Sequence, residues 1–262
     1  MTARSTPRLP ALFLGHGSPM NAVAQNAHTR AWQRLGHSIG IPRAILVISA
    51  HWYTRGTFVT GEPAPKTIHD FGGFPDALYQ IVYPAAGAPA LAADVAARLN
   101  GFGARVRTDW GLDHGAWSVL VHMYPAADVP VIQLSLDATR PWSDQYAIGA
   151  AISGLRENGV LVLGSGGIVH NLGRVDGRPA AAPPEWAQRF DDWVCERAVA
   201  GDDAALADRT GFDDAGRLAV PSPDHYLPLL TVLGTRCDGE TVTIPYRGFE
   251  LGTISLTAVQ VG

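Results

Sequence analysis

Leu12-Phe13-Leu14-Gly15-His16-Gly17-Ser18-Pro19 is an apolar run that ends at a histidine held between two glycines. A short apolar run that stops at a glycine is typical of a buried parallel strand, and the Ser-Pro pair predicts a turn after it. The arrangement recurs twice. The run AILVIS at 44–49 leads to His51, and the run VLVL at 160–163 leads through the glycine-rich residues 164–167 to His170. A single histidine at a strand end is most often an ordinary core residue, but three in this pattern indicate a shared site.

These three runs predict strands whose histidines meet at one edge of a sheet. Ligands bind beyond the carboxyl ends of the strands in an open α/β sheet. The order strand, helix, strand over residues 11–15, 27–39 and 44–49 indicates a parallel βαβ unit. We therefore predict an α/β fold, a single domain with a mostly parallel or mixed central sheet flanked by helices. Imidazole rings gathered at the carboxyl-terminal ends of the strands suggest a metal site.

The rest of the chain continues the alternation of strands and helices. Further strands are predicted at 104–108, 131–136, 241–245 and 253–260, and further helices at 88–99, 114–123, 141–157, 184–199, 201–209 and 222–234. Residues 54–87 are rich in glycine and proline, so we predict a long loop system there, with a strand at 56–60 and a helical turn at 75–79. Loops of this length in a compact domain are usually functional.

Composition narrows the class of protein. The chain has 262 residues, of which 47% are hydrophobic and 17% charged, without repeats or linkers, so we predict one catalytic domain over residues 1–262 with residues 1–10 as a flexible N-terminal tail. A net charge of −4 without basic blocks argues against nucleic-acid and anionic-membrane partners. Cys195 and Cys237 form no CxxC motif, and no apolar segment is long enough to span a membrane. A cytoplasmic location is expected.

Two further histidines lie at predicted helix starts. Ser222 and Pro223 predict an N-cap and a first helical residue, which places His225 at the third helical position. Asp113 in the same way places His114 at the first position of its helix. The helix dipole disfavours a protonated imidazole there, and both a metal ligand and a general base require the neutral ring.

Two other kinds of site are rejected. The residues Gly164-Ser165-Gly166-Gly167 do not form a dinucleotide fingerprint, because the third glycine would fall on Val169 and the motif belongs in the first βα turn. The GxSxG motif of nucleophilic hydrolases is absent, and neither cysteine has a catalytic context.

Five ordered blocks carry a resemblance to a known family. They are GHGSPMNA at 15–22, SAHW at 49–52, LDHGAWSVL at 112–120, GSGGIVHNL at 164–172 and PDHYLPLL at 223–230. Together they resemble the class III extradiol ring-cleavage dioxygenases, most of all the DODA-type branch (4,5-DOPA extradiol dioxygenase-like), from about residue 11 to the C-terminus. The resemblance implies an α/β core with a non-haem metal at the ends of the strands.

The same resemblance implies roles for particular residues. It puts metal-binding histidines onto His16, His51 and His225, where other members of the superfamily have a glutamate as the third ligand. His114 matches a substrate-side histidine. His170 matches a family histidine that acts either as a fourth metal ligand or as the acid/base. Because the predicted strand ends several residues before His170, its looser tether favours the acid/base role.

The resulting hypothesis is O2-dependent extradiol cleavage of a catechol, DOPA-like or a related aromatic diol, to a semialdehyde product. It requires one mononuclear divalent metal, with Fe(II) for activity. Imidazole sites also accept zinc, so Zn(II) is the alternative metal in the purified protein. A zinc-dependent hydrolase with the same histidine cluster and a non-catalytic metal-binding interaction protein are the alternative functions. The catechol substituent, the pathway and a homo-oligomeric state stay open.

A substrate pocket is predicted around the long loop. Its wall is assigned to His69, Phe71 and Phe74 of the loop 67–79, and to Tyr226 beside the third metal ligand. The negative net charge gives no general attraction for acidic substrates. A carboxylate on the catechol would therefore need a local cation or hydrogen-bond donor.

Overall fold

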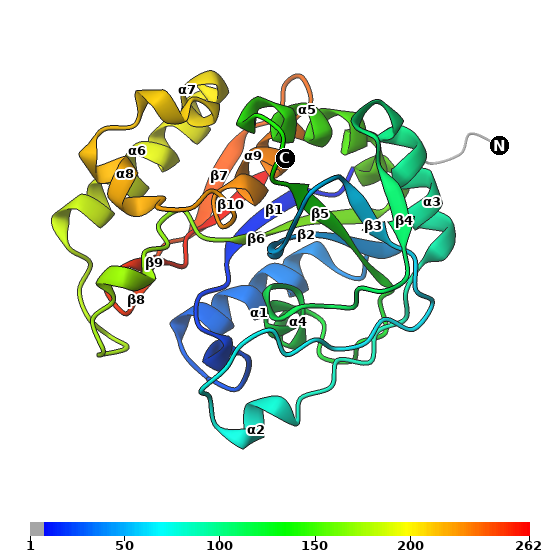
Figure 1. Cartoon of the computed structure of the whole chain (residues 1–262), viewed down its shortest axis with the longest axis horizontal. Coiled ribbons are helices and arrows are strands. Elements are labelled where there is room, and N and C mark those ends of the chain that lie inside the picture. The colour runs from blue at the N-terminus through cyan, green and yellow to red at the C-terminus, as the bar shows by residue number, and fades with distance from the viewer. Residues whose placement is uncertain (1–7) are drawn as a thin grey trace.

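Eight strands form one mixed sheet in the computed structural model, which describes residues 8–262 (Figure 1). The strand order across the sheet is β4-β3-β5-β2-β6-β1-β10-β7, and β8 and β9 pair separately as a small hairpin. The strands are β1 (Ala11–Gly15), β2 (Ala44–Thr54), β3 (Phe58–Thr60), β4 (Arg105–Arg107), β5 (Val131–Asp137), β6 (Val160–Gly166), β7 (Val242–Tyr246), β8 (Phe249–Glu250), β9 (Ile254–Ser255) and β10 (Ala258–Val261).

The centre of the sheet is parallel. Strand β6 lies between β1 and β2 and pairs in parallel with both, and β2 pairs in parallel with β5. The sheet is mixed because β10 runs antiparallel to β1 and β3 antiparallel to β5. The predicted α/β fold with a mostly parallel or mixed central sheet is confirmed. The carboxyl ends of β1, β6 and β2 therefore lie together at one edge.

Helices cover both faces of the sheet (Figure 1). Helices α1 (Ala27–Ile39) and α4 (His114–Met123) pack on one face, while α3 (Pro89–Arg98), α5 (Trp142–Ile152) and α9 (Leu227–Gly234) pack on the other. The remaining helices are α2 (Asp76–Tyr79), α6 (Glu185–Ala200), α7 (Asp203–Ala207) and α8 (Asp214–Ala219), and short 3-10 turns are η1 (Pro19–Ala22), η2 (Asn100–Phe102), η3 (Ser153–Asn158), η4 (Leu172–Arg174) and η5 (Arg209–Gly211).

Strand residues alternate between these two layers. In β1, Leu12 and Leu14 pack toward α1 and α4, whereas Phe13 packs into the opposite layer. All three side chains are fully buried, which explains why the strand is apolar throughout. Each such side chain contributes about 1.5–3 kcal/mol on burial. Packing on both faces fixes the strand ends from which the site residues extend.

The last long helix begins later than the sequence predicts. Its first residue is Leu227, where the prediction has Ser222 as the N-cap. A turn precedes it, closed by the Leu227 N–H donating to the Pro223 carbonyl (3.0 Å). Pro228 has no N–H with which to continue that turn into a helix. His225 therefore precedes the helix and is not at its third position, so the helix-dipole argument for its neutral ring is wrong.

Two smaller differences concern element bounds. Strand β2 continues to Thr54, beyond the predicted end at residue 49, and its pairing with β5 shifts between Ile48 and Tyr53. This irregular part of β2 contains His51. Helix α8 forms in a segment for which the sequence predicted no element.

Residues 1–7 of the predicted tail lie outside the described residues. The described residues of the predicted tail are held against the domain, because the Leu9 N–H donates to the Arg156 carbonyl (3.1 Å) and Arg8 pairs with Glu157 (2.5 Å). Among residues 8–262, no helix has both the length and the apolar character needed to cross a membrane.

Candidate metal centre

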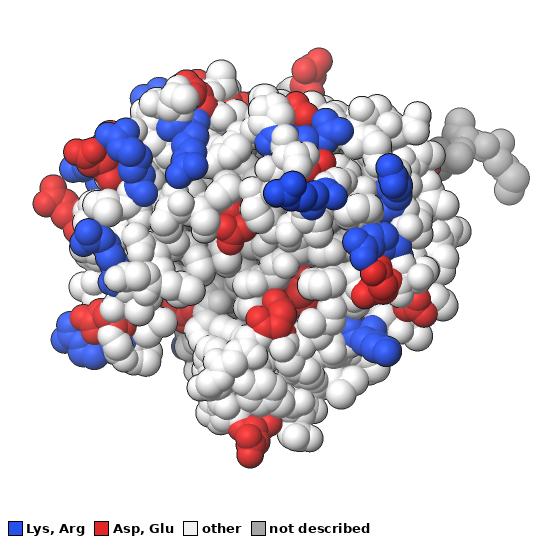
Figure 2. Space-filling view, viewed as in Figure 1, with Lys and Arg blue, Asp and Glu red and all other residues white. Residues whose placement is uncertain are grey.

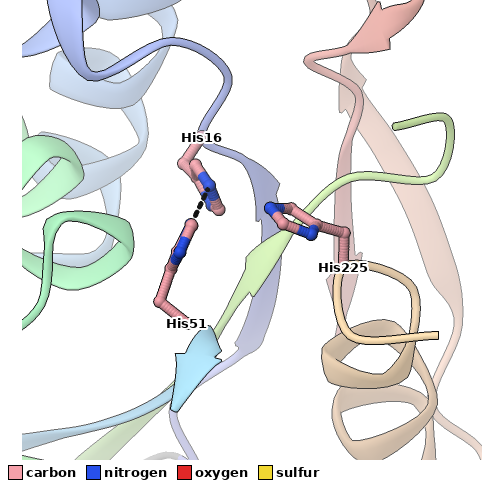
Figure 3. A group of neighbouring side chains, drawn as sticks. All are labelled: His16, His51 and His225. Atoms are coloured by element: carbon pink, nitrogen blue, oxygen red, sulfur yellow. Dashed lines mark hydrogen bonds between the residues drawn. The ribbon is translucent and has the colours of Figure 1, made fainter. Parts of the chain in front are cut away.

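Three histidines from distant parts of the chain converge at the carboxyl edge of the sheet (Figure 3). His16 follows β1, His51 lies in β2, and His225 lies in the turn before α9. One nitrogen of each ring lies within 4.8 Å of those of the other two, and the ring centroids are 5.0 to 5.3 Å apart. The convergence that the strand ends predicted is therefore present, with the third ring supplied by a turn.

The tautomer of His16 follows from its hydrogen bonds. The Ser165 hydroxyl donates its one proton to the Gly115 carbonyl (2.5 Å). It must therefore act as acceptor toward His16 Nδ1, which lies 3.0 Å away. His16 Nδ1 then carries the proton, and the lone pair is on Nε2. That atom faces the other two rings.

The other two histidines are held through Nδ1 in the same way. His51 Nδ1 lies 3.3 Å from Asp70 Oδ2, and His225 Nδ1 lies 2.5 Å from Asp224 Oδ2. A carboxylate favours a proton on the ring nitrogen that faces it, so each neutral ring keeps its lone pair on Nε2. His225 Nε2 is buried and has no hydrogen-bond partner among the described residues. A divalent metal would satisfy this atom, in the carboxylate–histidine–metal arrangement that is usual for such ligands.

The electrostatics of the cluster favour a metal over a proton. His16 Nε2 and His51 Nε2 lie only 3.0 Å apart, so two lone pairs face each other. Burial lowers the pKa of His16 well below 6.5, and the neighbouring histidines lower it further. Burial and His114 lower the pKa of His51 in the same direction, against the opposing charge of Asp70. Neutral rings at physiological pH are the state that ligation requires, so the residues fit one divalent metal.

Asp70 links this triad to a fourth histidine. Its Oδ1 accepts a hydrogen bond from the His114 backbone N–H (2.8 Å), and its Oδ2 lies 3.0 Å from His114 Nδ1. The rings of His114 and His51 are 3.9 Å apart. Burial alone would raise the pKa of Asp70, but the hydrogen bonds and positive charge of His114, with the charge of His51, outweigh it and lower the pKa. The carboxylate is therefore ionised and holds two rings at once.

The start of α4 confirms one prediction made from sequence. His114 is its first residue, and the Asp113 side chain caps it by accepting from the Ala116 N–H (3.2 Å). Asp113 also accepts from Ser49 Oγ (2.6 Å) and Gln133 Nε2 (2.7 Å), which ties the helix start to β2 and β5. Burial raises the pKa of Asp113, and the nearby charge of Asp70 raises it further.

His170 lies on the other side of the triad, against His225. The two rings stack with centroids 3.5 Å apart and planes within 5° of parallel. The His170 backbone N–H donates to the Ala219 carbonyl (2.9 Å), and the residue forms a β-bridge with Ile254. The backbone is therefore held on both sides, and the loose tether expected from sequence is wrong. Burial and the charge of His225 lower the pKa of His170 to about 3, so its ring is neutral.

A cavity of about 300 Å³ opens beside these rings, a volume at the lower end for small-molecule sites. Its polar side chains are mainly the five histidines and two carboxylates, and the remainder of its wall is mostly apolar. It is lined by His16, Gly17, Ser18, Pro19, His51, Asp70, Phe71, Phe74, His114, His170, Leu172, His225, Glu250, Leu251 and Ile254.

Two of the four predicted wall residues line this cavity. Phe71 and Phe74 face it, with ring centroids 5.4 Å apart. His69 lies beside Phe71 and is not in the wall, because its Nε2 is within 3.0 Å of a backbone carbonyl. Tyr226 is fully buried in the core, where its hydroxyl donates to a carbonyl of α7 (3.2 Å). The expected wall positions of His69 and Tyr226 are therefore wrong, since adjacency in sequence does not fix the side-chain direction.

Sequence reasoning missed several residues of the site. Asp70 was visible only as a carboxylate in the loop with the aromatic residues, and no spacing relates it to His51. In the sequence, Ser165 stands within the glycine-rich residues 164–167, and nothing there relates it to His16. The cavity residues Glu250, Leu251 and Ile254 belong to the β8–β9 hairpin, which follows the last block of resemblance and carries no motif.

Comparisons with known proteins agree with this geometry. A family model described as "Catalytic LigB subunit of aromatic ring-opening dioxygenase" matches residues 10–248. The chain is 45% identical to a 4,5-DOPA dioxygenase extradiol of Escherichia coli K12, over 98% of this chain and 96% of that protein. It is 36% identical to one from Beta vulgaris, over 93% and 92%. A crystal structure of an uncharacterized Escherichia coli K12 protein superposes with a TM-score of 0.85 at 40% identity, covering 97% of this chain and all of the other.

Proposed function

Because the chain belongs to the family of catalytic LigB subunits of aromatic ring-opening dioxygenases, we propose that it cleaves a catechol with O2 next to the diol, giving a semialdehyde. An extradiol ring-opening dioxygenase needs an aromatic substrate and O2. The substrate class proposed is a DOPA-like or related aromatic diol, as the names of the relatives suggest. We also propose that residues 1–262 act as one catalytic domain.

One observation supports a metal-dependent mechanism above all others. The Nε2 atoms assigned lone pairs, of His16, His51 and His225, belong to rings whose ligand atoms lie within 4.8 Å of one another, and His225 Nε2 is buried without a partner in residues 8–262. We propose that these three residues hold one mononuclear divalent metal. Bound Fe(II) would supply the electron transfer between the aromatic diol and O2, whereas zinc has no redox chemistry.

The remaining histidines are proposed to move protons. His170 is neutral, lines the cavity and stacks on one ligand, so it can accept a proton from a substrate hydroxyl and return it later. His114 lies beside a different ligand, and Asp70 near its Nδ1 favours a proton on that nitrogen. The two histidines therefore flank the metal position from two sides. We propose His170 as the acid/base and His114 as a catalytic histidine on the substrate side, rather than as permanent ligands.

Phe71 and Phe74 are proposed to bind the aromatic ring. Both line the cavity, and Phe71 also lies edge-on to His114, with centroids 5.4 Å apart. Aromatic side chains favour such edge-to-face contacts with another ring. They also exclude water from the site.

The test is O2 consumption by protein reconstituted with Fe(II), measured with an oxygen electrode across a panel of catechols. We expect uptake of one O2 per ring opened and a new visible absorbance from the semialdehyde. The zinc-loaded protein should consume none. Hydrolytic turnover that continues without O2 would contradict the proposal and favour a zinc hydrolase, and inactivity under all conditions would favour a non-catalytic metal-binding protein.

The ligand assignment is tested separately by metal content. His16→Ala should retain little metal by elemental analysis while its circular dichroism stays native. His37, exposed on α1, provides the matched control, since His37→Ala should keep the full metal content. Equal retention in both variants would overturn the assignment.

A further inference from the structure

We infer that the cavity selects catechols whose substituent is uncharged or carries a protonated amine, and that Glu250 determines this preference. The inference rests on the proposed function and deepens it, because it concerns the part of the substrate that does not react. Glu250 is assigned here as a specificity-determining residue that contacts the substituent.

The cavity wall contains two carboxylates and, within residues 8–262, no lysine or arginine that could pair with an anion. Among the described residues that line it, none is Lys or Arg, whereas Asp70 and Glu250 are both acidic. Figure 2 shows a hollow on this face bordered by white and red atoms, with the blue atoms farther out. A carboxylate that is the only charged group of the substituent would therefore face like charges without a partner, whereas an ammonium group, as in DOPA, would find one.

Glu250 is a buried carboxylate without a cation. Only 8% of it is exposed, and it makes no salt bridge within residues 8–262. Its Oε2 accepts from Asn21 Nδ2 (3.0 Å), and its Oε1 accepts from the Ser18 N–H. A carboxylate has about four acceptor positions, so two remain for a ligand. Burial raises the pKa of Glu250, against these two hydrogen bonds, and a cation brought into the cavity would offset that cost.

Asp70 is less suited to this role. Its two oxygens already face His114 and His51, and their contacts orient these two residues. Glu250, in contrast, lies against the turn after His16, because a Cβ placed on Gly17 would collide with Glu250 Oε1. It is therefore beside the metal position and in the cavity wall, within reach of a substituent on a ring bound through its diol.

The hairpin holds Glu250 in a fixed position. Leu251 and Gly252 adopt φ of +53° and +74°, the left-handed region, which turns the chain sharply between β8 and β9. The Leu251 N–H donates to the Pro179 carbonyl (3.1 Å), and its carbonyl accepts from the Asp176 N–H (2.9 Å). A non-glycine residue in this conformation costs free energy and persists only where its surroundings enforce it. The wall is therefore preorganised before substrate binds.

The experiment compares three catechols of similar size: dopamine, hydroxytyrosol and 3,4-dihydroxyphenylacetate, whose side chains are cationic, neutral and anionic. We expect KM to rise in that order, with dopamine and the anion separated by about 10- to 100-fold, the range for hydrogen bonds to a charged group. Anaerobic titration of the metal-loaded protein should give dissociation constants in the same order. Equal constants, or the reverse order, would overturn the inference.

Variants assign the effect to Glu250. Glu250→Gln should reduce the preference for dopamine over the anion at least several-fold, both in KM and in the anaerobic dissociation constants. Glu196→Gln removes the same charge from the exposed face of α6 and should leave the preference unchanged. A preference that persists in Glu250→Gln would contradict the assignment. O2 uptake that is independent of side-chain charge refutes this inference alone, whereas absence of uptake with every catechol refutes the proposed function.

Discussion

Asp70 shows how one residue organises several others. A single carboxylate lies against a proposed ligand, His51, and a proposed substrate-side catalytic histidine, His114, and also accepts from the backbone at the start of α4. Partners of this kind orient metal-binding rings and fix their tautomers. The loop that carries Phe71 and Phe74 is thereby fastened to the site.

Asp70→Asn should weaken metal binding and activity together, by about 10- to 100-fold each. The amide nitrogen can donate but not accept, and both Nδ1 atoms lie near the same oxygen, Oδ2. Replacing Oδ2 removes the acceptor of both rings, and replacing Oδ1 removes the acceptor of the His114 backbone N–H. Metal affinity is measured by competition with a chelator, and activity by O2 uptake. Asp76→Asn, an exposed change in the same loop, is the control. Full metal affinity in Asp70→Asn would mean that Asp70 does not orient the rings.

His170→Ala should keep its metal and lose about 10²–10⁴-fold in kcat, the usual range for a positioned acid/base. A fourth permanent ligand would leave six-coordinate Fe(II) only two positions, and a bidentate diol occupies both. Elemental analysis and steady-state kinetics on the same sample separate the two roles. Metal loss as large as in His16→Ala would make His170 a structural ligand instead.

At the scale of elements, the glycines of β6 control how closely α9 approaches the sheet. A Cβ on Gly164 would lie 2.8 Å from the Pro228 carbonyl oxygen, and a Cβ on Gly166 would collide with the carbonyl oxygen of His225. The two glycines are two residues apart, so they face the same side of the strand. They allow the turn that carries His225 to lie directly on the sheet.

Gly166→Ala should therefore displace the His225 turn. We expect a loss of stability of about 1–3 kcal/mol, typical of overpacking, and a larger relative loss of metal content. Gly167→Ala is the matched control, because its nearest contact would be 3.3 Å, whereas a Cβ on Gly166 would collide with the carbonyl oxygen of His225. Urea unfolding and elemental analysis give the two quantities. Native metal content in Gly166→Ala would show that the turn adapts freely.

Sequence patterns predicted elements well where burial on two faces dictates an apolar run. Strands β1 and β6 and helix α1 follow directly from such runs and from helical spacing. The start of α9 did not follow, because Ser222 and Pro223 satisfy the rules for a helix start while Pro228 stops the turn from continuing. The meeting of His16 and His51 was predictable because parallel strand ends lie at one edge, whereas His225 comes from a turn and its ligand role followed from the family resemblance. The hairpin with Glu250 was not, since tertiary contacts and not local propensity hold its turn.

At the scale of the whole molecule, the buried histidines make stability depend on pH. Burial lowers the pKa values of His16, His51 and His170 in the folded chain. As the pH falls, these histidines therefore bind protons in the unfolded chain before they do so in the folded chain. Stability from these groups is complete above the unfolded pKa of about 6.5 and is lost as pH falls below it. The carboxylates with lowered pKa, such as Asp70, add to the loss only below about pH 4.

The metal-free protein should therefore become less stable between pH 7 and 5. For His170, with a pKa of about 3, the loss by pH 5 is about 2 kcal/mol. His170→Gln removes one titrating ring, so its decrease over the same interval should be smaller by about that amount. Urea unfolding at pH 7, 6 and 5 measures both proteins. Parallel pH curves would mean that His170 is not a buried neutral ring.

The pairing of β1 with β10 has a consequence for synthesis. Ala11 lies opposite Val261, so the first strand of the described chain gains one of its two neighbours only from the last. On the ribosome, His16 emerges early, whereas His225 and the Glu250 hairpin emerge near the end. A nascent chain therefore holds at most part of the ligand set and none of the hairpin wall. The site for O2 chemistry is therefore complete only after translation has added the residues that enclose it.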